Sequence, residues 1–190
     1  MRHISRHQIA LATLALSAGA LAPSAASAGT AATAAGARVA SCAAAWGSTP
    51  ETSHAYSDMP IVNVRAGGHE CFDRLVVDVH DAAGYDVRYV DEVYTVGQGE
   101  VVPLRGGAKL QVTVFAPTYY EGVEVYRPAN PQELVDVTGY GTFRQAATGG
   151  SFEGATTLGL GVRARLPFRV FLLGSRNDDF RLVVDVAHRW

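Results

Sequence analysis

The sequence predicts an all-β protein, a two-sheet antiparallel β-sandwich of about nine short strands. Beyond residue 59 the chain consists of short runs rich in Val, Leu, Phe and Tyr, separated by Gly, Pro, Asp and Asn. None of these runs shows a sustained apolar repeat of helical period. The clearest strand alternates polar and apolar side chains from Lys109 to Val114, which indicates one buried and one solvated face.

The other strands follow from the same composition and from the turn residues between them. Gly, Pro, Asp and Asn mark turns at residues 83–84, 97–99, 106–107, 149–150, 166–167 and 177–178. The strands expected in chain order are residues 61–65, 72–80, 85–94, 109–115, 134–137, 142–145, 151–162, 168–173 and 180–187.

Composition excludes two classes of protein. With 190 residues, 48% of them hydrophobic and 18% charged, the chain is long and apolar enough to form one packed domain, which excludes a wholly disordered protein. The formal net charge is −2. We expect no nucleic-acid partner, because such binding requires an excess of basic residues.

The amino terminus has the pattern of a secretory signal peptide over residues 1–28, with Arg2 and Arg6, an apolar run and an A-x-A-like cleavage site. The run of about 14 apolar residues is shorter than a membrane span, so we expect a secreted or cell-wall associated protein without a span after processing. Residues 29–58 form a tether rich in Ala, Gly, Ser and Thr, and residues 59–190 form the folded domain. A lipidation signal ending at Cys42 is disfavoured, because it lies well beyond the apolar run.

Cys42 and Cys71 are the two cysteines of the chain, and export permits a disulfide between them. We expect this bond to tie part of the tether to the domain. The alternative is a catalytic or metal-binding Cys71 beside His69, but it lacks a third ligand. No metal or cofactor is predicted.

A hexapeptide occurs twice without change, as residues 74–79 and 181–186. Each copy reads Arg-Leu-Val-Val-Asp-Val and places its Arg and Asp on one face of a strand, so Arg74, Asp78, Arg181 and Asp185 are expected to pair within or between copies. The alternative interpretation is a carboxylate pair for acid/base chemistry. Structure is favoured, because each Asp has an Arg at hand that keeps it ionised.

Other chemical motifs are incomplete. Residues 149–154 fail the G-x-S-x-G pattern of serine hydrolases, and residues 159–161 lack the third glycine of a dinucleotide loop. His80 and His188 follow the two repeated strands without zinc-site spacing and are interpreted as strand-end caps. We expect no catalytic residue. A small hydrolase using Asp78, Asp185 and His188 stays as the weakest alternative.

Two surfaces are candidates for binding. The long insertion at residues 116–131 carries Tyr119, Tyr120 and Tyr126, whose rings could stack on sugars or pack the loop itself. Arg163 and Arg165 share one face beside a turn, where they could hold carboxylates or phosphates or could be a solvated strand face.

Several long motifs make the chain from about residue 46 to residue 190 similar to the AMIN-like domain proteins exported by high-GC Gram-positive bacteria. The motifs are Gly68-His69-Glu70-Cys71-Phe72-Asp73-Arg74-Leu75-Val76-Val77-Asp78, Gly84-Tyr85-Asp86-Val87-Arg88-Tyr89-Val90, Ser151-Phe152-Glu153-Gly154, the run from Gly159 to Val170, and Arg181-Leu182-Val183-Val184-Asp185-Val186-Ala187-His188. The resemblance implies a β-sandwich that opens and closes with the repeated strands.

The resemblance also implies a function. AMIN domains are noncatalytic modules that localise envelope proteins, including cell-wall amidases, by binding peptidoglycan. No amidase domain follows the last strand of this sequence, so the resemblance implies a stand-alone module that binds a cell-wall polymer. The alternative is a protein-interaction module that recruits or regulates a cell-wall protein.

Overall fold

The computed structural model describes Cys42, residues 44–175 and residues 178–190. The predicted signal peptide, the lipidation signal before Cys42, and residues 29–41 and 43 of the predicted tether therefore lie outside the described residues. Within these ranges no helix long and apolar enough to cross a membrane is found. The strands are Glu51–Ser53 (β1), Ile61–Gly68 (β2), Phe72–Val79 (β3), Tyr85–Val90 (β4), Val93–Tyr94 (β5), Val101–Val102 (β6), Ala108–Val114 (β7), Tyr119–Tyr120 (β8), Val123–Glu124 (β9), Phe143–Phe152 (β10), Ala155–Val162 (β11), Phe168–Ser175 (β12) and Asp178–Ala187 (β13).

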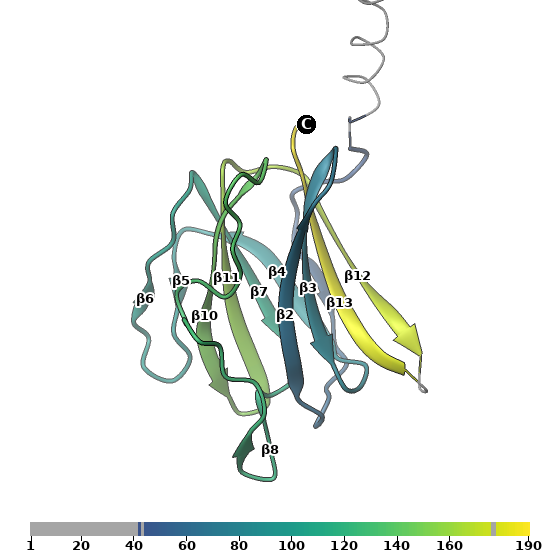
Figure 1. Cartoon of the computed structure of the whole chain (residues 1–190), viewed down its shortest axis with the longest axis vertical. Helices are drawn as coiled ribbons and strands as arrows, with labels where there is room; N and C mark the ends of the chain where they lie inside the picture. The colour runs from purple at the N-terminus through teal and green to yellow at the C-terminus, as the bar shows by residue number, and fades with distance from the viewer. Residues whose placement is uncertain (1–41, 43, 176–177) are drawn as a thin grey trace, which may run out of the picture.

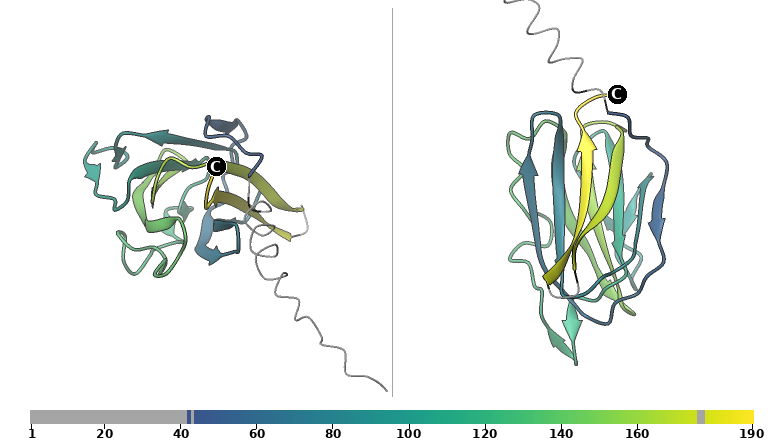
Figure 2. Two further views of the ribbon diagram at one scale, coloured as in Figure 1. Left: turned by 90° about the horizontal axis from the view of Figure 1, so that it is seen from above. Right: turned by 90° about the vertical axis from the view of Figure 1, so that its right-hand side faces the viewer.

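The strands form the predicted β-sandwich, with two antiparallel sheets facing each other (Figure 1). One sheet has five strands in the order β1-β4-β7-β11-β10, and the other has four in the order β12-β13-β3-β2. The two layers are also clear from above and from the side (Figure 2). Two short hairpins, β5-β6 and β8-β9, extend from this frame. The main sheets thus contain nine strands, but these are not the nine predicted: β1 was not expected, residues 134–137 form no strand, and the predicted strand 151–162 spans the turn between β10 and β11.

The core lies between the sheets and is built from alternate side chains of both. Leu75, Val77, Leu110, Leu160 and Leu182 are buried in one apolar cluster. Alternation sends the intervening residues of the four-stranded sheet outward. Val76 and Val183 face outward, yet both are buried.

The two repeated hexapeptides are neighbours at the centre of the four-stranded sheet. β3 and β13 pair antiparallel, with Arg74 opposite Asp185 and Arg181 opposite Asp78. The two copies are therefore related by an approximate two-fold axis. This register places each arginine opposite a carboxylate of the other copy, which favours a structural role for the repeat.

The predicted turn at residues 149–150 is wrong. Gly149 and Gly150 lie inside β10, where a bulge follows Thr148 and Gly150 has a φ of +95°. The chain reverses instead at Glu153 and Gly154, whose φ values of 48° and 78° belong to a two-residue turn with both central residues left-handed. The glycines supply a bulge, which requires the same left-handed freedom as a turn.

Three further expectations need correction. Residues 134–137 are not a strand, although Leu134 N donates to Ala146 O and thereby covers the edge of β10. The expected strand 85–94 is interrupted after Val90 and gives β4 and β5. The predicted tether extends too far, to residue 58. Glu51 to Ser53 form β1, which pairs with β4 at the edge of the five-stranded sheet.

Glu51 joins the two sheets at this edge and gives a pH-dependent prediction. Its Oε2 accepts a hydrogen bond from Val170 N of β12 at 3.1 Å, and burial raises the pKa of the Glu51 carboxyl above 4.5. A raised folded-state pKa means that folding favours the protonated form, so this group lowers stability as the pH rises through the region above 4.5. We expect Glu51→Gln, which keeps the acceptor without the charge, to gain stability relative to the wild type at neutral pH but not in acid.

Denaturant unfolding of both proteins at about pH 4 and about pH 7 measures this difference. Asp58→Asn, which removes the charge of an exposed carboxylate, is the matched control. An equal stability difference at both pH values would contradict the assignment to Glu51.

Candidate functional site

The predicted tyrosine insertion forms a hairpin that projects from one end of the sandwich. β8 and β9 pair through Tyr119 opposite Glu124 and Tyr120 opposite Val123, and Figure 1 shows this hairpin beyond the ends of the main sheets. Glu121 and Gly122 make its turn with φ values of 49° and 79°. We call β8, its turn and β9 the tyrosine hairpin.

The base of the tyrosine hairpin is fixed to the sandwich by hydrogen bonds. Thr118 N donates to Ser151 Oγ of β10, and the Thr118 carbonyl accepts from Val125 N and Tyr126 N. Between the hairpin and β10 lies a hollow of about 520 Å³, which we call the inner hollow. Its lining combines aromatic, proline and hydroxyl groups and consists of Thr118, Tyr119, Gly122, Glu124, Tyr126, Arg127, Pro128, Pro131, Thr148, Gly150 and Ser151.

The three predicted tyrosines have two different roles. Tyr119 and Tyr120 are 38% and 43% exposed on the hairpin. Tyr126 packs against the core, and burial raises the pKa of its hydroxyl. Tyr119 and Tyr126 line the inner hollow together. The structure therefore provides two accessible rings and one half-buried ring that supports them.

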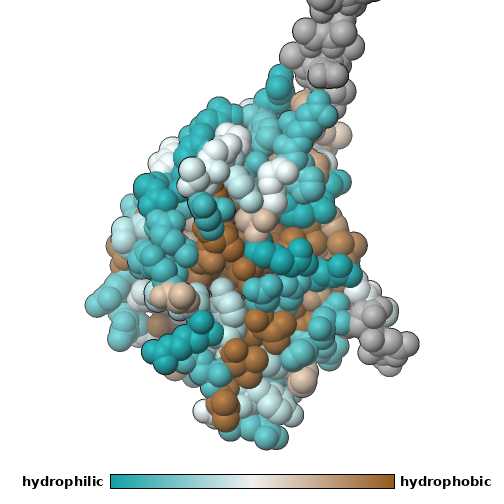
Figure 3. All heavy atoms as spheres, in the orientation of Figure 1, coloured by the Kyte–Doolittle hydropathy of each residue, from teal (hydrophilic) through white to brown (hydrophobic). Residues whose placement is uncertain are grey.

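A second hollow, of about 450 Å³, lies between the two Glu-Gly turns of this end of the molecule. Tyr119 and Tyr120 line it together with Glu121 of one turn and Glu153 of the other. Phe152 beside the second turn is 53% exposed. Figure 3 shows hydrophobic residues reaching the end of the molecule where Figure 1 places β8. This end thus combines exposed aromatic rings with carboxylates.

Arg163 and Arg165 do not continue a strand but follow the end of β11 in an irregular segment. Arg163 Nη2 donates to the carbonyl of His188. Arg165 donates to Ser48 Oγ and Ser48 O, and its own carbonyl accepts from Trp190 Nε1. Both guanidinium groups are therefore engaged in holding chain termini of the domain, which favours a structural role over a shared anion site.

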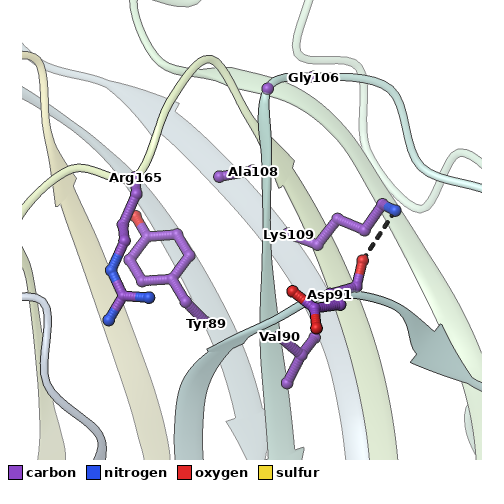
Figure 4. A pocket seen from close by; sticks show the side chains of 8 residues that line it. Tyr89, Val90, Asp91, Gly106, Ala108, Lys109 and Arg165 are labelled. Atoms are coloured by element: carbon purple, nitrogen blue, oxygen red, sulfur yellow. Dashed lines mark hydrogen bonds between the residues drawn. The ribbon is translucent and has the colours of Figure 1, made fainter.

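Arg165 also borders a hollow of about 420 Å³ beside β7 (Figure 4). Its guanidinium carbon lies 5.1 Å from the centre of the Tyr89 ring. Lys109 lines the same hollow, donates to the Asp91 carbonyl at 2.9 Å and pairs with Glu92 at 2.6 Å. Because both cations already have partners, this hollow offers an anion little free positive charge.

A charged and aromatic cluster occupies the outer face of the four-stranded sheet. Asp185 is fully buried and accepts from Arg74 Nε at 2.6 Å and Nη2 at 2.8 Å, and from Arg169 Nε at 2.9 Å. The Arg169 guanidinium lies 4.3 Å from the centre of the Trp46 ring. Of the two pairings expected from the hexapeptides, within one strand or crossed between copies, Arg74 and Asp185 form the crossed one.

The side chains of the hydrolase alternative do not converge. His188 Nε2 contacts Asp73 Oδ1 at 2.9 Å, whereas Asp78 binds Arg65 and Asp185 is buried between arginines. Asp78 and Asp185 lie near opposite ends of two antiparallel strands, which separates them along the sheet. This particular arrangement of a catalytic site is therefore contradicted.

The model of the AMIN-like domain matches residues 59–188, most of the chain. The chain belongs to the AMIN-like domain family. A search of curated proteins found no match.

The AMIN-like domain covers both main sheets except β1. Membership indicates a cell-envelope module related to peptidoglycan. An extracytoplasmic location fits this family and the bond between Cys42 and Cys71, which is present as predicted. The tyrosine hairpin, the inner hollow and the charged and aromatic cluster around Asp185 all lie within the AMIN-like domain, except for Trp46.

Sequence reasoning missed two features of the site. The sequence contains an aromatic residue followed by Glu-Gly at residues 120–122 and again at 152–154, and both pairs make hairpin turns. The repeated pattern was the signal that could have predicted these turns. Stacking of Trp46 on Arg169 had no local signal, because the two residues are far apart in the chain.

Proposed function

We propose that this AMIN-like domain is a noncatalytic envelope module that binds a cell-wall polymer, peptidoglycan, through the tyrosine hairpin. The observation that carries the proposal is the inner hollow, which joins the exposed Tyr119 ring to Tyr126 and to the hydroxyls of Thr118 and Ser151. Family membership supports the polymer, because it indicates a module related to peptidoglycan.

The chemistry of the inner hollow suits a sugar chain. Aromatic faces pack against the apolar faces of sugar rings, and hydroxyl groups exchange hydrogen bonds with sugar hydroxyls. The one ion pair in its lining, Arg127 with Glu124 at 3.7 Å, is exposed on the hairpin. A mostly uncharged lining favours a neutral glycan over a polyanion.

The test is sedimentation of the full, oxidised chain with purified cell-wall sacculi, with and without teichoic acids, at low and physiological salt. We expect saturable pelleting that survives physiological salt, because stacking contacts are not screened. Absence of pelleting under every condition would overturn polymer binding.

Replacing Tyr119 and Tyr120 with Ala locates the binding surface. Exposed aromatic anchors supply much of the binding energy at such surfaces, so we expect the amount bound to fall by about tenfold or more. Tyr94→Ala is the matched control, because Tyr94 is 50% exposed on β5, outside the tyrosine hairpin. Equal binding by the control and the double variant would place the site elsewhere.

A second candidate is a protein-interaction module that recruits or regulates a cell-wall enzyme. The observation that favours it is the exposed apolar surface at the hairpin end, where Val123 is 66% exposed and Phe152 is 53% exposed. Soluble wall fragments separate the two candidates. They should displace the chain from sacculi if it binds the polymer, and they should have no effect if a wall-attached protein retains it.

A further inference from the structure

The approximate two-fold relation between the repeated hexapeptides is broken in one respect. Arg74 donates two hydrogen bonds to Asp185 of the other copy. The equivalent pair, Arg181 with Asp78, does not form although the two residues are register partners. Asp78 instead accepts from Arg65 Nε and Nη2 at 3.0 Å each. The second arginine of the repeat is therefore left without its carboxylate.

Arg181 has no replacement partner in the described part of the chain. Its Nε is buried and makes no hydrogen bond. An arginine offers five donors, and leaving buried donors unsatisfied costs stability. The side chain is half-buried and borders a hollow of about 610 Å³ on the outer face of the four-stranded sheet. Within the described residues the Nη groups of Arg181 also make no hydrogen bond or ion pair, so a ligand in this hollow could supply an acceptor to them, whereas the buried Nε is closed to it.

The other charges around the hollow restrict that ligand. Asp78 is paired with Arg65, whereas Asp179 is 61% exposed and, among the described residues, contacts only His80 Nδ1, at 2.8 Å. Asp179 and Arg181 are two residues apart on β13 and so lie on one face. They form no ion pair with each other, although both line the hollow. A polyanion here would meet the carboxylate of Asp179 as well as the guanidinium.

We propose that this hollow binds an amino-acid group that carries a carboxylate and an ammonium on one carbon atom. The carboxylate pairs with Arg181 and the ammonium with Asp179, so that both charges of the hollow are satisfied. In a wall-binding module this site contacts the peptide part of the polymer, whereas the tyrosine hairpin contacts the glycan. Only this assignment to wall peptide rests on the proposed function.

The test is nuclear magnetic resonance of the arginine Nε–H groups in the full, oxidised, isotope-labelled chain. Three probes are added into the millimolar range: alanine with both charges, N-acetylalanine with the carboxylate alone, and alanine amide with the ammonium alone. We expect a saturable shift of the Arg181 signal that is strongest with alanine, weaker with N-acetylalanine and absent with alanine amide. An equal response to alanine amide, or no saturable response to alanine, would overturn the site.

Variants separate recognition from folding. Arg181→Lys keeps the charge and the apolar stem but not the planar fork. We therefore expect the affinity for alanine to fall by about tenfold or more, with the fold retained. Asp179→Asn should weaken alanine but not N-acetylalanine. Arg88→Gln, on the other sheet, is the control and should leave alanine binding unchanged. Unaltered alanine affinity in Arg181→Lys would overturn the site.

The two proposals fail separately. Pelleting with sacculi but no alanine binding would keep the wall-binding function and remove this site. Alanine binding without pelleting would keep the site and remove the wall polymer as its source.

Discussion

Asp185→Asn is expected to lower the free energy of unfolding by about 3 kcal/mol, because it removes the buried acceptor of charge-assisted hydrogen bonds from two partly exposed arginines. Asp185 is fully buried on β13, between Arg74 of β3 and Arg169 of β12. Asparagine has the same shape but no charge, and its amide NH₂ would face a guanidinium. Two arginines on the outer face of the sheet would then lack a counter-charge.

The hexapeptide repeat supplies a matched control. Asp78 occupies the equivalent position in the other copy, but its side chain is 16% exposed and its partner Arg65 is half exposed. Because solvent screens this pair, we expect Asp78→Asn to cost only about 1 kcal/mol. Guanidinium unfolding of both variants measures the difference. Equal losses of unfolding free energy in the two variants would show that the burial of Asp185 does not determine how much it stabilises the domain.

The burial of Asp185 makes it unsuited to acid catalysis. A general acid requires a raised pKa and access to substrate. Asp185 has two arginines on its oxygens and no exposed surface. Asp185 links three strands of the sheet, whereas the sequence predicted only that its charge would be satisfied by an arginine of the repeat at the sheet surface.

Local patterns predicted the fold well because a sandwich is built from alternating strands. The alternation from Lys109 to Val114 became β7, and the repeated hexapeptides became β3 and β13. Pairing of the two copies was also foreseeable, since each carries complementary charges. The boundary of the domain was not, because β1 is held by its pairing with β4 and by the Glu51 contact to β12 rather than by its own composition.

The candidate site was less predictable because it depends on long-range contacts. The sequence singled out Tyr119, Tyr120 and Tyr126 but did not show that the third ring would pack inward. The sequence also could not show which arginine of the repeat, Arg74 or Arg181, would lack an ion pair with the other copy. That outcome depends on Arg65 of β2, which lies outside both copies of the repeat.

Removing the disulfide by Cys42→Ser and Cys71→Ser is expected to lower the free energy of unfolding by about 3–4 kcal/mol, from the added chain entropy of the unfolded state. The bond closes a loop with a sequence separation of 29. It also holds the segment that carries Trp46 against the four-stranded sheet, where the indole contacts Phe72 and Arg169. Loss of the bond should release this segment as well as destabilise the domain.

Tryptophan fluorescence separates these two consequences. In a Trp190→Phe background Trp46 is the remaining tryptophan of the chain, and its emission should shift toward the solvent-exposed position in the double serine variant before any unfolding. The disulfide-bonded Trp190→Phe protein is the control. A stability loss without a change in emission would mean that Gly47 pairing with Phe168 holds the segment and that the bond acts on the unfolded chain alone. A loss below about 1 kcal/mol would contradict the chain-entropy argument itself.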